Sequence, residues 1–384
     1  MKADFVERVR RRVVNAGAGI TFAGVAAAIR DESGGVAGDK DVLDALRLLG
    51  QELEGAGPLD PLLRDPDTTD VLVTGPGEVW VEGRTGLRRT DVRFPDEPSV
   101  RRLAQRLAAA AGRRLDDAQP FVDAWLPGGI RMHAVLPPIV PAGTCLSLRV
   151  LRPAVHNVDT LCRLGTVDGQ GAELLRAVVS ARLAFVVVGG TGSGKTTLLG
   201  AMLGAVPPGE RIVCVEDAAE LAPTHPQFVR LVARPPNIEG TGGVGVRELV
   251  RQALRMRPDR LVVGEVRGAE VVELLTALNT GHEGSAGTLH ANSPAEVPAR
   301  FEALAALGGL PRSALHSQLA AAVRTVLFMR RDGDARRLAE VGVLQRNGDY
   351  VKVSPAWRPG ERLPARAVLT ELLTERGVMP PWTP

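Results

Sequence analysis

The chain has 384 residues, of which 45% are hydrophobic and 24% are charged. This composition is typical of a soluble globular protein, and it excludes a disordered tail, a collagen-like fibre and a disulfide miniprotein. The formal net charge is only +3 and aromatic residues make up 3%, so direct binding of nucleic acid is not expected.

At about 150 residues per domain, the length predicts two or three domains. Residues 1–55 are expected to form a helical N-terminal segment, because apolar residues recur there at helical spacing around a glycine-rich loop. The sequence shows no secretion leader, no apolar run of about 20 residues and no pairing pattern among its three cysteines. These features predict a cytoplasmic protein.

Residues 56–152 are expected to form a small α+β domain. Short β-branched runs separated by glycine turns predict strands, and apolar residues at helical spacing predict one helix over 100–111. The strands are expected near 70–74, 78–82, 87–90, 129–136 and 145–151. The next segment, 153–165, reads as a linker.

Residues 166–384 are expected to form an α/β domain. Short, continuous, β-branched runs predict central strands of a sheet that is covered on both faces. These runs are 183–188, 211–215, 260–263 and 286–289. A helix with apolar and arginine faces is expected before the third run and is ended by Pro258. The tail predicts strands at 341–344 and 350–353 and a final helix over 366–376.

The strongest chemical signal follows the first of these runs, where the sequence GGTGSGKTT satisfies the pattern G-x-x-x-x-G-K-[ST] between a strand and a helix. Glycines let backbone N–H groups converge on phosphate oxygens, and a lysine adds a positive charge. The predicted nucleotide-binding residues are Gly189, Gly190, Thr191, Gly192, Ser193, Gly194, Lys195, Thr196 and Thr197. Lys195 is the only lysine between residues 41 and 351, which argues against a mere glycine-rich turn.

Carboxylates follow two of the other predicted strands. Glu216 ends one strand, Glu265 follows another, and Arg267 lies two residues further on. Because ligands of open α/β sheets bind at the carboxyl ends of strands, these three are candidate catalytic residues. Thr196 is expected to ligate Mg²⁺ directly, and Glu216 and Glu265 through water or as a base. Solvated strand caps are the alternative.

Two histidines, His282 and His290, lie on either side of a glycine-rich turn and the strand after it. They are candidates for sensing or stabilising the γ-phosphate of a nucleotide. Ordinary core or surface histidines are the alternative interpretation.

These motifs together resemble the type II/IV secretion ATPase superfamily. Its Walker A, Asp, Walker B and His boxes match Gly189–Thr197, Cys214–Leu221, Arg255–Arg267 and Thr280–Pro294 in that order. Two N-terminal stretches, Asp70–Pro76 with Val79–Val81 and Arg131–Pro138, resemble the tight-adherence (Tad/Flp) pilus branch. The type II secretion members carry a tetracysteine zinc site, which three scattered cysteines cannot supply, so zinc is not expected.

The resemblance implies a RecA-like P-loop motor domain that uses ATP and Mg²⁺, a homohexameric ring, and an inner-membrane platform protein as partner. It also implies that arginines of the N-terminal domain reach the nucleotide, and Arg131, Arg149 and Arg152 are the candidates. Ordinary surface arginines are the alternative interpretation of these three.

The sequence therefore predicts a hexameric Mg²⁺-dependent ATPase that powers Tad/Flp-type pilus assembly or a related secretion machine. It would be cytoplasmic and held at the inner face of the cell membrane through its partners. Three alternatives remain open: a conjugative DNA-transfer ATPase of the same superfamily, a RecA-like nucleic-acid motor, and a regulatory protein that binds nucleotide without hydrolysing it.

Overall fold

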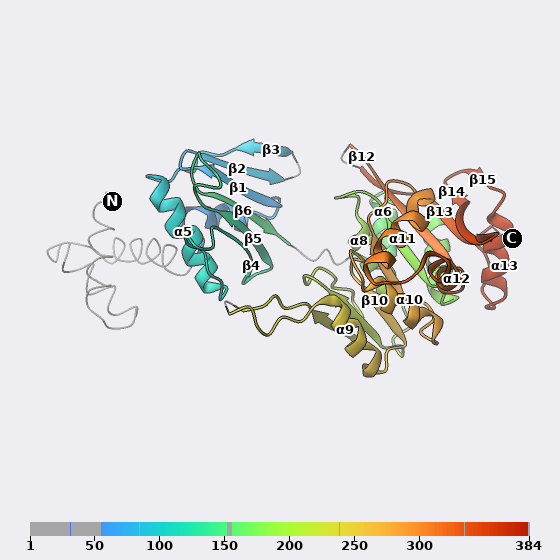
Figure 1. Cartoon of the computed structure of the whole chain (residues 1–384). Helices are drawn as coiled ribbons and strands as arrows, with labels where there is room; N and C mark the ends of the chain where they lie inside the picture. The colour runs from blue at the N-terminus through green and yellow to red at the C-terminus, as the bar shows by residue number, and fades with distance from the viewer. Residues whose placement is uncertain are drawn as a thin grey trace. The chain divides into compact units, whose positions relative to one another are not determined.

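The computed structural model describes residues 31, 55–83, 85–151, 156–237, 239–333 and 335–382 (Figure 1). The chain divides into two compact units, with the division between residues 151 and 152. Nearly all of the helical segment predicted for residues 1–55 lies outside the described residues, as does Arg152.

The first unit is a six-stranded antiparallel sheet with the strand order β3-β2-β1-β6-β5-β4. Helix α5 (Glu97–Ala110) packs its apolar side into the core of this sheet, and its first turn is capped by Asp96, which accepts a hydrogen bond from the Ser99 N–H. The strands are β1 Asp70–Gly75, β2 Glu78–Gly83, β3 Gly86–Arg89, β4 Phe121–Leu126, β5 Ile130–Val135 and β6 Cys145–Val150. The 3₁₀ turn η1 (Gly57–Leu59) and helix α4 (Asp60–Arg64) precede them. The expectation of an α+β unit agrees with this sheet, to which the structure adds β4.

The second unit is built on a nine-stranded sheet with the order β15-β14-β13-β12-β7-β11-β10-β8-β9. Strands β12, β7, β11, β10, β8 and β9 run parallel, and β13 to β15 extend the sheet in antiparallel fashion. The strands are β7 Phe185–Val188, β8 Ile212–Glu216, β9 Phe228–Val232, β10 Arg260–Val263, β11 Ala286–Leu289, β12 Thr325–Asp332, β13 Ala335–Asn347, β14 Tyr350–Arg358 and β15 Glu361–Arg362.

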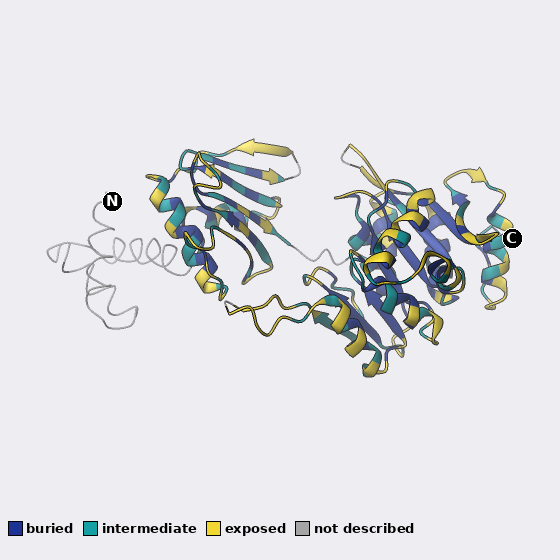
Figure 2. Ribbon diagram, in the orientation of Figure 1, coloured by how far each residue is buried: buried dark blue, intermediate teal, exposed yellow. Residues whose placement is uncertain are grey.

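Both faces of this sheet are covered, which gives the strands their continuous apolar sequences. Phe185 and Val187 of β7 lie in one core cluster, whereas Val186 and Val188 lie in the other. The described helices are α6 Val158–Arg163, α7 Gly169–Ser180, α8 Lys195–Leu203, α9 Val246–Ala253, α10 Val271–Asn279, α11 Val297–Leu307, α12 Arg312–Ala322 and α13 Arg366–Thr374, with 3₁₀ turns η2 Leu254–Met256 and η3 Pro294–Glu296. Figure 2 shows buried strands between helices whose outer sides are exposed. The prediction of an α/β domain is confirmed.

The prediction of a linker over 153–165 is wrong for its second half, which contains a helix. Residues 158–163 form α6, whose Val158 and Leu161 are buried in the core of the second unit. The Asn157 side chain accepts a hydrogen bond from the Thr160 N–H and begins this helix. Two buried residues at i and i+3 are too short a signal to reveal a helix from sequence. Within the described residues, no helix is long and apolar enough to cross a membrane.

Candidate active site

The predicted phosphate-binding loop joins β7 to α8 at the carboxyl end of the strand. Gly189 has φ +151°, and a Cβ added there would lie 2.3 Å from the Met329 carbonyl oxygen of the neighbouring strand β12. Gly192 and Gly194 have φ +70° and +92°, which L side chains rarely adopt. The loop conformation therefore requires glycine at these three positions.

Lys195 is turned into this loop and is only 8% exposed. Its Nζ donates hydrogen bonds to the carbonyl oxygens of Gly189 (3.1 Å) and Gly190 (2.9 Å), and burial lowers its pKa. The hydroxyl of Ser193 is buried and has no hydrogen-bond partner in the described part of the chain. A positive charge and an unpaired donor in a glycine loop fit an anionic ligand such as a polyphosphate.

Glu265, Arg267 and His290 form a connected group beside this lysine. His290 Nε2 lies 2.6 Å from Glu265 Oε1, and the guanidinium of Arg267 pairs with Glu265 Oε2. On the other side of the ring, His290 Nδ1 lies 3.4 Å from Lys195 Nζ. Burial and the charge of Lys195 lower the pKa of His290, which favours a neutral imidazole near pH 7. The structure thus brings four of the predicted site residues together.

The position of Glu216 differs from the expected one. Its Oε1 accepts the backbone N–H groups of Glu220 (3.1 Å) and Leu221 (2.9 Å), and its Oε2 lies 3.1 Å from Arg230 Nε. The residue is 3% exposed, and burial raises the pKa of its carboxyl group to about 7. A Cβ added to Gly264 would lie 2.7 Å from Glu216 Cγ, so the glycine before Glu265 makes room for this side chain.

Glu220, for which the sequence predicted no role, is an acid of this segment that contacts the loop. Thr196 Oγ1 donates to Glu220 Oε2 at 3.5 Å. The expected role of Glu216 near Mg²⁺ therefore fits Glu220 better, and Glu216 instead holds the backbone that carries Glu220. The signal in the sequence is a second glutamate four residues after the strand-ending one.

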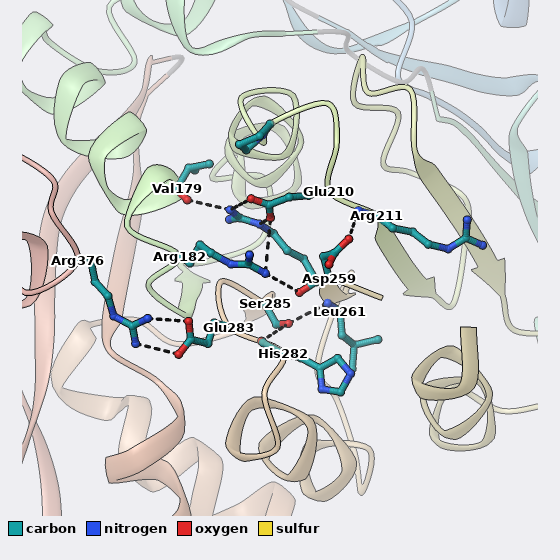
Figure 3. Close-up of polar contacts among 12 residues, drawn as sticks. Val179, Arg182, Glu210, Arg211, Asp259, Leu261, His282, Glu283, Ser285 and Arg376 are labelled. Carbon is teal, nitrogen blue, oxygen red and sulfur yellow. Dashed lines mark hydrogen bonds and ion pairs between the residues drawn. The ribbon is translucent and has the colours of Figure 1, made fainter. Parts of the chain in front are cut away.

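His282 does not lie with the P-loop, in contrast to the expectation. It precedes β11, and its Nδ1 lies 3.1 Å from the Ala277 carbonyl oxygen, whereas His290 follows the carboxyl end of the same strand. A four-residue strand at about 3.3 Å per residue separates these ends by about 13 Å. Figure 3 shows His282 among the residues at the amino ends of the strands. The γ-phosphate role predicted for both histidines is retained here for His290 alone.

A buried arginine packs against the turn that carries His282. Arg260 is 1% exposed, pairs with Glu210 at 2.7 Å, and donates to the Val179 carbonyl oxygen at 2.9 Å. Figure 3 labels these two partners, Glu210 and Val179. A Cβ on Gly284, which has φ +72°, would lie 2.8 Å from Arg260 Nη1. These contacts connect segments at the amino ends of the strands, so this group stabilises the fold and lies apart from the loop.

A cavity of about 360 Å³ opens beside the loop and is lined by Gly189, Gly190, Thr191, His290, Ala291, Asn292 and Arg300. Arg300, from α11, donates to the His290 carbonyl oxygen at 3.0 Å and was not found from the sequence. Of the N-terminal arginines, Arg131 pairs with Asp123 and Arg149 with Asp70 inside the first unit. Their predicted role toward the nucleotide stays a prediction.

Comparison with known proteins identifies a family and several relatives that this chain resembles. Residues 52–341 match the family model described as "Type II/IV secretion system protein". A protein of Mycobacterium tuberculosis named as a putative conjugal transfer protein is 62% identical over 347 residues, which cover 88% of this chain and 99% of that protein. The type IV secretion system protein PtlH of Bordetella pertussis is 33% identical over 322 residues, covering 76% of this chain and 94% of its own.

Among solved structures, the pilus retraction motor PilT with bound ADP superposes with a TM-score of 0.54 at 19% identity, covering 82% of this chain and 85% of that one. This likeness supports the fold, an α/β domain preceded by a smaller N-terminal domain.

Proposed function

The chain belongs to the type II/IV secretion system protein family, and on that premise we propose that it is a Mg²⁺-dependent ATPase motor. The motor would power assembly of a Tad/Flp-type pilus or a related secretion machine across the inner membrane. The observation that carries the proposal is the contact chain from the P-loop lysine through His290 to Glu265.

Each side chain has a distinct part in hydrolysis. The loop amides and Lys195 bind the phosphates, and Glu265 orients the attacking water and accepts its proton as the water oxygen bonds to the γ-phosphorus and ADP leaves. His290, held neutral, and Arg267 keep the Glu265 carboxylate in place. Mg²⁺ would neutralise phosphate charge, and Thr196 with Glu220, whose side-chain oxygens lie 3.5 Å apart, would supply oxygen ligands.

The direct test removes the lysine. Lys195→Ala should abolish ATP hydrolysis in the full chain while leaving a folded protein, as judged by circular dichroism. Lys352→Ala is the matched control, because Lys352 is exposed on β14 of the same unit. Turnover by Lys195→Ala near that of the wild type would exclude this site as the ATPase centre.

We also propose that the protein works as a homohexamer, with arginines acting across subunits. An arginine supplied by a neighbouring subunit raises the rate of phosphoryl transfer roughly 10³- to 10⁵-fold. Specific activity should therefore rise with protein concentration as rings form, measured alongside light scattering. Full activity of a monomer across dilution would contradict ring-dependent catalysis.

A conjugative DNA-transfer motor is the second candidate, favoured by the name of the Mycobacterium tuberculosis relative. The two functions differ in what stimulates turnover. A pilus motor should be recruited to membranes only when its platform protein is co-expressed, and its ATPase rate should not respond to DNA. Salt-sensitive stimulation by DNA would favour the second candidate.

A further inference from the structure

The hairpin formed by β12 and β13 carries a pair of arginines beside the P-loop. Arg331 and Arg336 are directly opposite each other in the register, so their side chains share one face of the hairpin. Arg336 Nε donates to the Gly192 carbonyl oxygen at 2.9 Å, and Arg331 Nη1 lies 3.4 Å from the position that a Cβ on Gly192 would occupy. Both guanidinium groups therefore reach the tip of the loop.

The charge of this face is not balanced by the described residues. Like charges directly opposite in a sheet are destabilising. On the other face of the hairpin, Arg330 lies opposite Arg337 but has the carboxylate of Asp332 at 2.8 Å. Arg331 and Arg336 form no ion pair with any described residue. Two cations held together at a P-loop without a carboxylate point to an anionic ligand.

The sheet order indicates which part of a nucleotide this ligand is. Strand β7 leads into the P-loop between two neighbours, β11 and β12. On the β11 side, His290 contacts Lys195. This side of the loop is therefore suited to the γ-phosphate. The hairpin lies on the β12 side, so its arginines are placed toward the phosphates nearer the nucleoside.

We propose that Arg331 and Arg336 bind the α- and β-phosphates of the nucleotide, which ATP and ADP share. Arg336 also holds the tip of the P-loop through its Nε, and its two terminal nitrogens remain for the ligand. This inference rests on the proposed nucleotide site and adds a second cationic wall to it. The arginines then contribute to ground-state binding of both nucleotides rather than to the chemical step.

The test compares ADP affinity and ATPase kinetics in the full chain. Arg336→Ala and Arg331→Ala should each weaken ADP binding, measured by calorimetry, by about tenfold, and should raise KM for ATP while kcat is retained. Arg337→Ala, one residue away on the opposite face, is the matched control and should bind as the wild type does. Arg336→Lys should keep part of the affinity, because it retains the charge but loses the planar fork.

The outcomes separate this inference from the proposed function. A wild type that binds neither ADP nor ATP defeats the proposed function itself. A wild type that binds normally, with Arg331→Ala and Arg336→Ala binding equally well, overturns the arginine pair alone. Equal losses in Arg337→Ala, or a fall in kcat with unchanged ADP affinity, also overturn it.

Discussion

The buried carboxyl group of Glu216 should make the stability of this protein depend on pH in an unusual direction. Burial raises its pKa from an ordinary value of 4.5 to about 7, against the opposing effects of two backbone N–H donors and Arg230. Between pH 4.5 and 7 the folded state keeps a proton that the unfolded chain has lost. Unfolding then releases a proton, so raising the pH through this window lowers the free energy of unfolding.

The magnitude follows from the size of the shift. A change from 4.5 to about 7, at 1.36 kcal/mol per unit, corresponds to about 3 kcal/mol. Glu216→Gln removes the titration but keeps an oxygen to accept the Glu220 and Leu221 N–H groups. The difference between the unfolding free energies of wild type and variant should therefore change by about 3 kcal/mol from pH 4 to pH 8, with the wild type losing stability.

Urea unfolding of both chains across this pH range measures the difference. Because the chains differ at one side chain, the contributions of other titrating groups cancel. Arg230→Gln provides a second check, because loss of its charge should raise the pKa of Glu216 and extend the window upward. A difference that stays constant from pH 4 to pH 8 would show that folding does not shift the pKa of this carboxyl group, and it would refute the reasoning.

Three further predictions concern the two proposed catalytic acids and the packing of one glycine turn. Glu265→Gln should bind Mg²⁺-ATP but hydrolyse it roughly 10²- to 10⁴-fold more slowly, whereas Glu220→Gln should raise the Mg²⁺ concentration needed for half-maximal activity; wild-type kinetics in both variants would exclude these roles. Gly284→Ala should destabilise the protein by about 1–3 kcal/mol in thermal unfolding, because its methyl group meets Arg260. Gly348→Ala, at a similar φ of +64° in open space, should lower the free energy of unfolding by less. Equal losses of stability in the two variants would assign the effect to backbone strain alone.

Much of the second unit could be predicted from sequence because the signals are local. A strand buried on both faces has to be continuously apolar, so β7, β8, β10 and β11 are visible as short β-branched runs. The P-loop is equally local, because its glycines serve backbone angles within one turn and Lys195 belongs to the same turn. Strand β9 was missed, because it is only partly buried and carries Arg230 in its middle.

The α/β class, the glycine loop with Lys195 and the acids at the strand ends can be predicted from the amino-acid sequence, since each depends on neighbours in the chain. Which of these side chains come into contact depends on the folded arrangement of distant segments. Glu216 and Glu220 are both glutamates of one segment, and the sequence does not distinguish their roles. In the fold, Glu216 is buried beside Gly264, whereas Glu220 contacts Thr196. His282 precedes β11 and His290 follows it. Because β11 runs parallel to β7, only His290 lies at the edge of the sheet where β7 leads into the loop. Contacts between distant segments, such as Arg336 with Gly192, arise from strand order, which no local pattern encodes.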